Sequence, residues 1–233
     1  MILNHSNCNE VLYATTFKLP DQRFFMTRLS LDNIAKRFGR RVLFRKLSCA
    51  VDGGSVLAIT GANGSGKSTL LKIIAGVMTP SKGDVTLHLE GKNVSVEDRP
   101  LHIGYVAPYL NVYDGFSARE NLAFIAKVRS LPANNGQIDE LIELVSLKGR
   151  ENDLVQNYSS GMKQRVKIAA AILTQPPVLI LDEPSTNLDV AGIEMVKRVI
   201  NMQRDRQGVV ILASNSAEEV KWSDHAISVQ DYR

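Results

Sequence analysis

The sequence has only two cysteines and one tryptophan among its 233 residues. Cys8 and Cys49 share no close-spaced metal-binding pattern, so we expect free thiols in a reducing compartment, with a disulfide as the less favoured alternative. No apolar run approaches the roughly 18 residues that a membrane-spanning helix needs, so a membrane role would depend on another chain. The first residues also lack a basic segment followed by a long apolar one, and we therefore expect no secretory signal.

A strong charge of one sign is also absent. Lysine plus arginine number 28 against 24 aspartates plus glutamates, a formal net charge of +4, and the positive residues are scattered along the chain. This distribution fits an anionic ligand or a nearby membrane surface, and it does not by itself indicate nucleic acid. With 44% hydrophobic residues, the chain can form one domain, or one domain with an inserted subdomain.

The first 25 residues show no clear periodicity of apolar residues, and we interpret them as an N-terminal extension of the domain. Either Met26 is the natural start and residues 1–25 are a wrongly assigned extension, or these residues form a flexible arm. From Met26 onward, residues 26–34, 42–51, 52–60, 84–91 and 102–106 have the patterns of strands.

Between about residues 117 and 175 strand patterns disappear, and three helical patterns follow one another at 118–130, 136–147 and 160–175. Pro176 and Pro177 end the last of them. Strands then resume at 177–182, 208–214 and 225–230, with an amphipathic helix through Val199 and a short helix between them. This order predicts an α/β core that carries an inserted α-helical subdomain.

A glycine-rich loop, "GANGSGKST", lies between a predicted strand and a predicted helix. It matches the phosphate-binding pattern of P-loop NTPases, in which backbone N–H groups and the helix N-terminus face phosphate oxygens. Lys67 should reach the β- and γ-phosphates of ATP, and the Ser68 hydroxyl should bind Mg²⁺. The predicted nucleotide-binding residues of this loop are Gly61, Asn63, Gly64, Ser65, Gly66, Lys67, Ser68 and Thr69.

A second motif, "PVLILDEPSTNLD", supplies two carboxylates at the end of an apolar strand. Asp182 emerges beside the phosphate loop, where it can hold Mg²⁺ through water. Glu183 follows directly and is the candidate general base, because a carboxylate there can polarise the attacking water. Read alone, the acidic pair could be a solvated loop, and it is the phosphate loop that favours the catalytic interpretation.

A third motif, "YSSGMKQR" at residues 158–165, lies at the start of a helix between these two motifs. With all three motifs in this order, the sequence resembles the nucleotide-binding subunits of ATP-binding cassette (ABC) transporters. The resemblance covers about Arg28 to Val229 and implies an antiparallel β subdomain beside the P-loop NTPase core. It implies head-to-tail pairing of two subunits, in which Ser159, Ser160 and Gly161 contact the ATP held by the opposite chain. Met162 stands where the family usually has glutamine. Without the other motifs, this stretch would read as an ordinary helix cap.

Three further features follow from the resemblance. Phe38 stands where the family stacks an aromatic ring on adenine, although it could also be a core or surface residue. Asp189, in "STNLD", would lie near the dimer interface. The entry to the helical insert should contact the membrane partner, with Tyr109, Leu110, Tyr113 and Phe116 as apolar candidates, unless these side chains fold into the subdomain core.

Two positions depart from the family pattern. Pro108 replaces a glutamine that touches metal and attacking water, and its side chain offers neither a donor nor an acceptor. Asn215 replaces a histidine that contacts the γ-phosphate; its amide can donate a hydrogen bond but cannot carry charge. We expect slower hydrolysis with ATP binding spared, at a cost of roughly 2–4 kcal/mol by analogy with oxyanion-hole deletions. Asn215 could instead be a simple strand-end cap.

The sequence thus predicts an ATPase domain over residues 26–233, with a helical subdomain at about 117–175. Its implied ligands are ATP and Mg²⁺, and its implied partners are a second cassette subunit and a separately encoded transmembrane permease, with no nucleic acid. By analogy, the resemblance favours an exporter subunit that is peripheral on the cytoplasmic face of the cell membrane. An ATP-gated assembly or regulatory module with very slow hydrolysis is the alternative, and a soluble ABC protein acting on ribosomes or DNA is less favoured.

Overall fold

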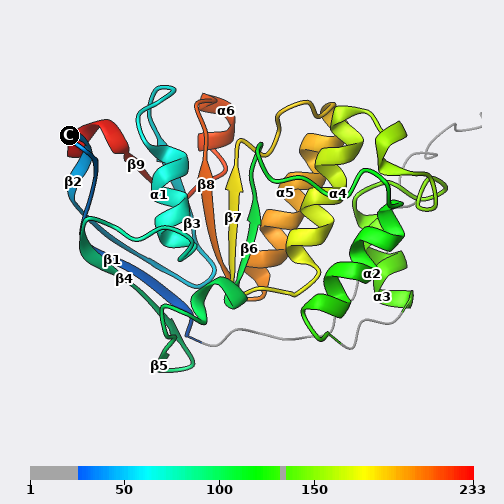
Figure 1. The fold of residues 1–233 in the computed structure, drawn as a ribbon, viewed down its shortest axis with the longest axis horizontal. Helices are drawn as coiled ribbons and strands as arrows, with labels where there is room; N and C mark the ends of the chain where they lie inside the picture. Colours follow the sequence, from blue (N-terminus) through cyan, green and yellow to red (C-terminus); the bar gives the residue numbers. More distant parts are fainter. Residues whose placement is uncertain (1–25, 132–134) are drawn as a thin grey trace, which may run out of the picture.

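The computed structural model describes residues 26–131 and 135–233, so the expectations for residues 1–25 and Cys8 lie outside the described residues. Two sheets and a group of helices make up the molecule (Figure 1). The strands are β1 (Arg28–Phe38), β2 (Arg41–Asp52), β3 (Val56–Thr60), β4 (Lys82–Leu89), β5 (Lys92–Asn93), β6 (Ile103–Val106), β7 (Val178–Asp182), β8 (Val209–Ala213) and β9 (His225–Ser228). The helices are α1 (Lys67–Ile74), α2 (Ala118–Val128), α3 (Asn135–Leu144), α4 (Ser160–Ile172), α5 (Val190–Asp205) and α6 (Ala217–Val220), with short 3₁₀ turns at η1 (Arg99–His102), η2 (Val155–Asn157) and η3 (Val229–Tyr232).

One sheet is antiparallel, with the order β2-β1-β4-β5, and the other is parallel, with the order β6-β7-β8-β3-β9. Every residue of β7 and β8 is buried, as expected for central strands of a parallel sheet covered on both faces. The α/β class and the antiparallel β subdomain are therefore confirmed. Because β7, β8 and β3 are neighbours, the segments that follow them meet at one edge of the sheet.

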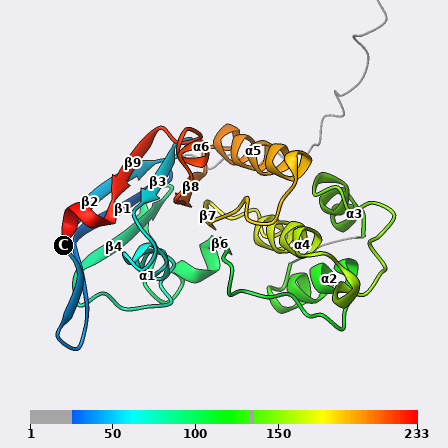
Figure 2. The same ribbon diagram turned by 90° about the horizontal axis from the view of Figure 1, so that it is seen from above.

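The parallel sheet separates two apolar cores, and alternate residues of each strand point into different ones. Ile180 and Ile211 pack with α1 and the antiparallel sheet, whereas Leu181 and Leu212 pack with α5 and the helical insert. Figure 2 shows α1 and α5 on opposite sides of the parallel strands. This burial fixes the register, because a shift of one residue would exchange the two faces.

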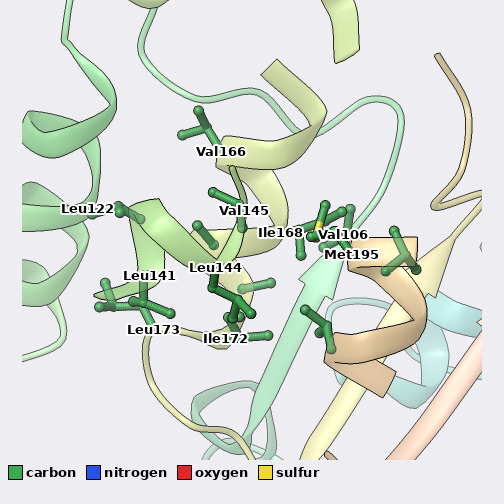
Figure 3. Close-up of a cluster of buried hydrophobic side chains, with 14 of the residues drawn as sticks. Val106, Leu122, Leu141, Leu144, Val145, Val166, Ile168, Ile172, Leu173 and Met195 are labelled. Carbon is green, nitrogen blue, oxygen red and sulfur yellow. The ribbon is translucent and has the colours of Figure 1, made fainter. Parts of the chain in front are cut away.

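The helical insert consists of α2, α3 and α4, which pack around a shared apolar cluster (Figure 3). Ser117 begins α2 with a capping box: its hydroxyl accepts from the Glu120 N–H, and the Glu120 carboxylate accepts from the Ser117 N–H. Leu122, Leu141 and Val166, one from each helix, are almost fully buried in this cluster. The three helices predicted from the sequence are therefore confirmed, with ends shifted by a few residues.

Helix α5 extends beyond the predicted end at Val199 to Asp205. Met202 packs against the core and Gln203 is buried, so the inward face of the helix continues beyond Val199. The prediction ended too early because a polar residue, Gln203, occupies part of this buried face. The helix ends where Gln207 adopts a φ of 60° and the Gly208 N–H donates to the Gln203 carbonyl. None of the described helices is long and apolar enough to cross a membrane.

Candidate active site

The phosphate loop joins the end of β3 to the start of α1. Gly66 precedes the helix with a φ of 113°, and Gly61 has a φ of 136°. These backbone conformations strongly favour glycine. A Cβ atom on Gly61 would also lie 2.8 Å from the Ser65 hydroxyl. The two glycines therefore allow the chain to turn tightly from β3 into the N-terminus of α1.

Lys67 is 6% exposed, and its amine lies over this loop. Its Nζ donates to the Gly61 carbonyl at 2.7 Å and to Asn215 Oδ1 at 2.6 Å. Asn215 in turn donates from Nδ2 to Asn63 Oδ1. The structure thus brings Asn215 from the end of β8 onto the phosphate loop, so it is more than a strand-end cap.

Asp182 ends β7 and is 2% exposed. Burial raises the pKa of this carboxyl group, and a hydrogen bond with the Ser68 hydroxyl partly opposes the shift. Its Oδ2 atom is buried and has no hydrogen-bond partner among the described residues. A buried carboxylate oxygen with no partner, beside a hydroxyl at the phosphate loop, fits the hard oxygen ligands that Mg²⁺ prefers.

Glu183 follows with a φ of 50°, a conformation that is unusual for a non-glycine residue. Its N–H donates to the Ala213 carbonyl at 2.9 Å, which fixes it between β7 and β8. Glu183 and Phe38 line one open cleft, with a volume of about 420 Å³, together with Arg41, Leu43, Asn63, Gly64, Gly66, Lys67, Ser68 and Thr69. Phe38 is 50% exposed there, and the Lys36 amine lies 5.1 Å from the centre of its ring.

The signature segment lies elsewhere on the chain. The Ser159 hydroxyl caps α4 by accepting from the Met162 N–H at 3.2 Å, and Ser160 is the first residue of that helix. Ser159 and Gly161 line a separate hollow that includes Asn187 and Asp189. Within one chain the signature and the phosphate loop therefore line different surfaces.

Asp189 is tied to the signature helix. It caps α5 by accepting from the Gly192 N–H, and its Oδ1 lies 2.8 Å from Arg165 on α4. These hydrogen bonds lower the pKa of the Asp189 carboxyl group. A Cβ on Gly161 would lie 2.6 Å from the Asn187 carbonyl, so glycine permits the close approach of the segment that leads to Asp189.

The segment after β6 carries Pro108, whose carbonyl accepts from Lys167 at 3.3 Å. The next residue, Tyr109, forms a hydroxyl pair with Tyr105 at 2.6 Å, and Lys72 of α1 lies 4.2 Å from the centre of its ring. Desolvation raises the pKa of Tyr105, with smaller contributions from Tyr109 and Asp182. No sequence signal identified this pair, because it depends on how the segment folds back against β6.

The predicted aromatic entry to the helical insert lies on the surface. Tyr109, Leu110, Tyr113 and Phe116 are 45%, 38%, 56% and 37% exposed, so the alternative in which they fold into the subdomain core is wrong. Tyr113 and Phe116 pack edge-to-face against Phe124 of α2, and their ring centres lie 5.2 and 6.0 Å from that of Phe124, respectively. The sequence analysis missed Phe124 because it is one apolar residue among several in an amphipathic helix.

Comparisons with known proteins agree with this geometry. Residues 44–186 match the family model described as ABC transporter. The chain is 34% identical over 192 residues to the cytochrome c biogenesis ATP-binding export protein CcmA of Haemophilus influenzae, covering 82% of this chain and 91% of that protein. It is 31% identical over 196 residues to the bacitracin transport ATP-binding protein BcrA of Bacillus licheniformis, covering 84% of this chain and 64% of the relative.

An import protein is also similar. The sulfate/thiosulfate import ATP-binding protein CysA of Thermosynechococcus vestitus is 36% identical over 166 residues, which cover 69% of this chain and 48% of that protein. Among solved structures, a dimeric post-hydrolysis ATP-binding cassette bound to ADP and Pi has the same fold, with a TM-score of 0.75 and 22% identity over 86% of this chain and 93% of that one. The chain therefore belongs to the ABC transporter family, in which it is an ATP-binding and ATP-hydrolysing subunit.

Proposed function

We propose that Glu183 is the general base for attack of water on the γ-phosphate of ATP, and that Lys67 and Asn215 contact that phosphate. The supporting observation is that the carboxyl ends of β3, β7 and β8 bring these three side chains to one edge of the sheet. In the structure, the Lys67 amine donates hydrogen bonds to the Gly61 carbonyl and to Asn215 Oδ1. ATP would replace these acceptors with phosphate oxygens, and the positive charge would then stabilise charge developing in the transition state.

Ser68 and Asp182 would hold Mg²⁺. Bound at this position, Mg²⁺ would neutralise charge on the β- and γ-phosphates. Asp182 has a buried, unpartnered oxygen available for this role, directly or through water. Gly61, Asn63, Gly64, Ser65, Gly66 and Thr69 would surround the phosphates, and Phe38 would stack on the adenine.

We also propose that the complete site needs a second cassette subunit. Ser159 and Gly161 line a different hollow from the phosphate loop, and Ser160 lies between them at the start of α4, so one chain cannot place both surfaces on one ATP without a large rearrangement. Head-to-tail pairing would put the N-terminus of α4 against the γ-phosphate held by the partner, where its N–H groups favour negative charge. Residues 26–233 would act as the ATPase domain, and closure around ATP would move the helical subdomain at about 117–175 inward.

The permease would dock on the exposed aromatic residues at the entry to that subdomain. Tyr113, Phe116 and Phe124 form a contiguous cluster there, and clustered exposed aromatic residues often mark an interaction site. Through this partner the subunit would lie at the cytoplasmic face of a membrane, with no role for nucleic acid. We favour export, because the similarity to the export protein CcmA covers 82% of this chain, whereas the similarity to the import protein CysA covers 69% of it.

Phosphate release from Mg-ATP by the purified chain, compared with its Glu183→Gln variant, tests the proposal. Glutamine keeps the size of the side chain and removes the base, so turnover should fall to the background level while ATP binding remains. Equal turnover in the two proteins would contradict the assignment of Glu183. If both proteins bind ATP and neither releases phosphate, even with the permease restored, the ATP-gated module becomes the better description of a pair of identical chains.

A further inference from the structure

Glu219, on the short helix α6, is a buried carboxylate beside the proposed site and has no role in the mechanism above. It is 3% exposed. Its Oε1 accepts from the Ser185 backbone N–H at 3.1 Å and from the Ser185 hydroxyl, while its Oε2 has no partner among the described residues. A carboxylate buried in this way is unfavourable unless its hydrogen bonds compensate, so the contact with Ser185 needs a physical explanation.

Ser185 lies two residues after Glu183, in the segment that sets the orientation of the proposed base. Glu183 has a positive φ, and such a conformation persists only when the surroundings hold it. Three backbone anchors surround it: the Glu183 N–H bonds to Ala213, the Pro184 carbonyl accepts from Gln164 of α4 at 3.1 Å, and Ser185 bonds to Glu219. Of these anchors, only the one from Glu219 brings a charged group.

The same carboxylate also links this segment to the loop after β8. Asn215 lies two residues before α6, and the N–H of Ser216, the N-cap of that helix, donates to the Ser214 hydroxyl at 2.9 Å. A shift of α6 would therefore displace Ser185 and Asn215 together. Glu183 and Asn215 face the same phosphate in the proposed mechanism, so their spacing must be held within a fraction of an ångström for efficient turnover.

We propose that Glu219 is a positioning residue for ATP hydrolysis: through Ser185 it fixes the segment that follows Glu183 and holds it at a constant spacing from Asn215. This inference rests on the proposed role of Glu183. It concerns the hydrolysis step rather than ATP binding, because Glu219 bonds to the segment after β7 and not to the phosphate loop. Its removal should therefore lower kcat and leave the affinity for ATP unchanged.

The test compares the Glu219→Ala, Glu219→Gln and Glu218→Ala variants in phosphate release and equilibrium ATP binding. Glu218 is the matched control: it neighbours Glu219 on α6, its side chain is 77% exposed, and it pairs with Lys221 at 2.6 Å on the surface. We expect Glu219→Ala to lower kcat at least about tenfold with the Kd for ATP within about twofold of the original, the result of misplacing a catalytic group. Glu218→Ala should leave both quantities unchanged.

Glu219→Gln provides the rescue, because its amide oxygen can accept the same two bonds from Ser185. It should retain most of the turnover that the alanine variant loses, which a general loss of packing would not predict. If Glu219→Ala does not fold, Ser185→Ala carries the test: it removes only the hydroxyl bond and should lower kcat by a smaller factor.

Two results with a folded Glu219→Ala variant would overturn the inference: a kcat within about twofold of the original, or a loss of kcat accompanied by a loss of ATP affinity. If Glu219→Ala does not fold, an unchanged kcat in Ser185→Ala would overturn it. Failure of the proposed function has a different signature, since Glu183→Gln would then keep full turnover. A loss of turnover in Glu183→Gln together with unchanged turnover in Glu219→Ala would reject the inference alone.

Discussion

Replacing Asn215 with histidine should raise the rate of ATP hydrolysis. The Asn215 amide already reaches the phosphate loop, where it accepts from Lys67 at 2.6 Å and donates to Asn63. It can therefore supply a neutral hydrogen bond to the γ-phosphate, and what it lacks is positive charge. Neutral hydrogen bonds contribute about 0.5–1.5 kcal/mol and those with a charged group about 1.5–3 kcal/mol. The gain on conversion to histidine is then about 1–1.5 kcal/mol, or about tenfold in kcat.

The position of Lys67 adds a pH signature to this prediction. Its amine would lie next to the new imidazole and disfavour the protonated form, so the pKa of that histidine should be lowered. The variant should accordingly be fastest on the acidic side of neutrality, where the imidazolium forms, and its rate should fall as the pH rises. The original protein has no such group at this position, and its profile should lack that feature.

The assay measures phosphate release against ATP concentration between about pH 6 and 8.5, a range that spans the ordinary pKa of histidine. Asn215→Ala is the companion variant, because it removes the neutral hydrogen bond of about 0.5–1.5 kcal/mol and should reduce kcat by about two- to tenfold relative to asparagine. If histidine leaves kcat unchanged while ATP still binds, or if alanine equals asparagine, then Asn215 makes no contact with the transition state and the reasoning is wrong.

Two further predictions concern groups whose pKa is raised by burial or partial burial. Asp182→Asn should raise the melting temperature measured without nucleotide by about 2–4 °C, because it removes a buried carboxylate with an unpartnered oxygen. The same substitution should abolish the stabilisation by Mg-ATP. Thermal unfolding with and without Mg-ATP measures both effects. The pKa of Asp182 is higher in the folded state than in the unfolded state. Between these two pKa values the folded state retains a proton that the unfolded state has lost, so the free energy of unfolding should decrease as the pH rises. The Asp182→Asn variant has no carboxyl group at this position and should not show this decrease. Burial raises the pKa of Cys49 to about 11, so iodoacetamide should modify this cysteine slowly at pH 8 and faster as the pH increases. Peptide mass mapping distinguishes Cys49 from Cys8, and rapid labelling of Cys49 in the folded protein at pH 8 would contradict this prediction.

The site was predictable wherever one short segment carries both the chemistry and its structural context. The glycines before Lys67, and the apolar strand before Asp182 and Glu183, define a strand, a turn and the side chains at its end within a dozen residues. The parallel order of the strands then requires these turns to meet at one edge. For this reason the phosphate loop, the acidic pair and Asn215 were all expected close together, and the structure places them so.

Contacts between segments distant in sequence were not predictable. Glu219 and its exposed neighbour Glu218 are the same residue type in one helical turn, and only packing decides which of them is buried against Ser185. The hydroxyl pair of Tyr105 and Tyr109 likewise depends on the path of the chain around Pro108.

The sequence by itself determined the fold class, the family and the reaction, because hydrophobic periodicity and the phosphate loop are local patterns with a direct physical meaning. The tertiary structure alone decided which polar groups support the proposed base and which aromatic residues remain on the surface. Those outcomes depend on strand order, helix rotation and side-chain burial, which arise only when distant segments pack together.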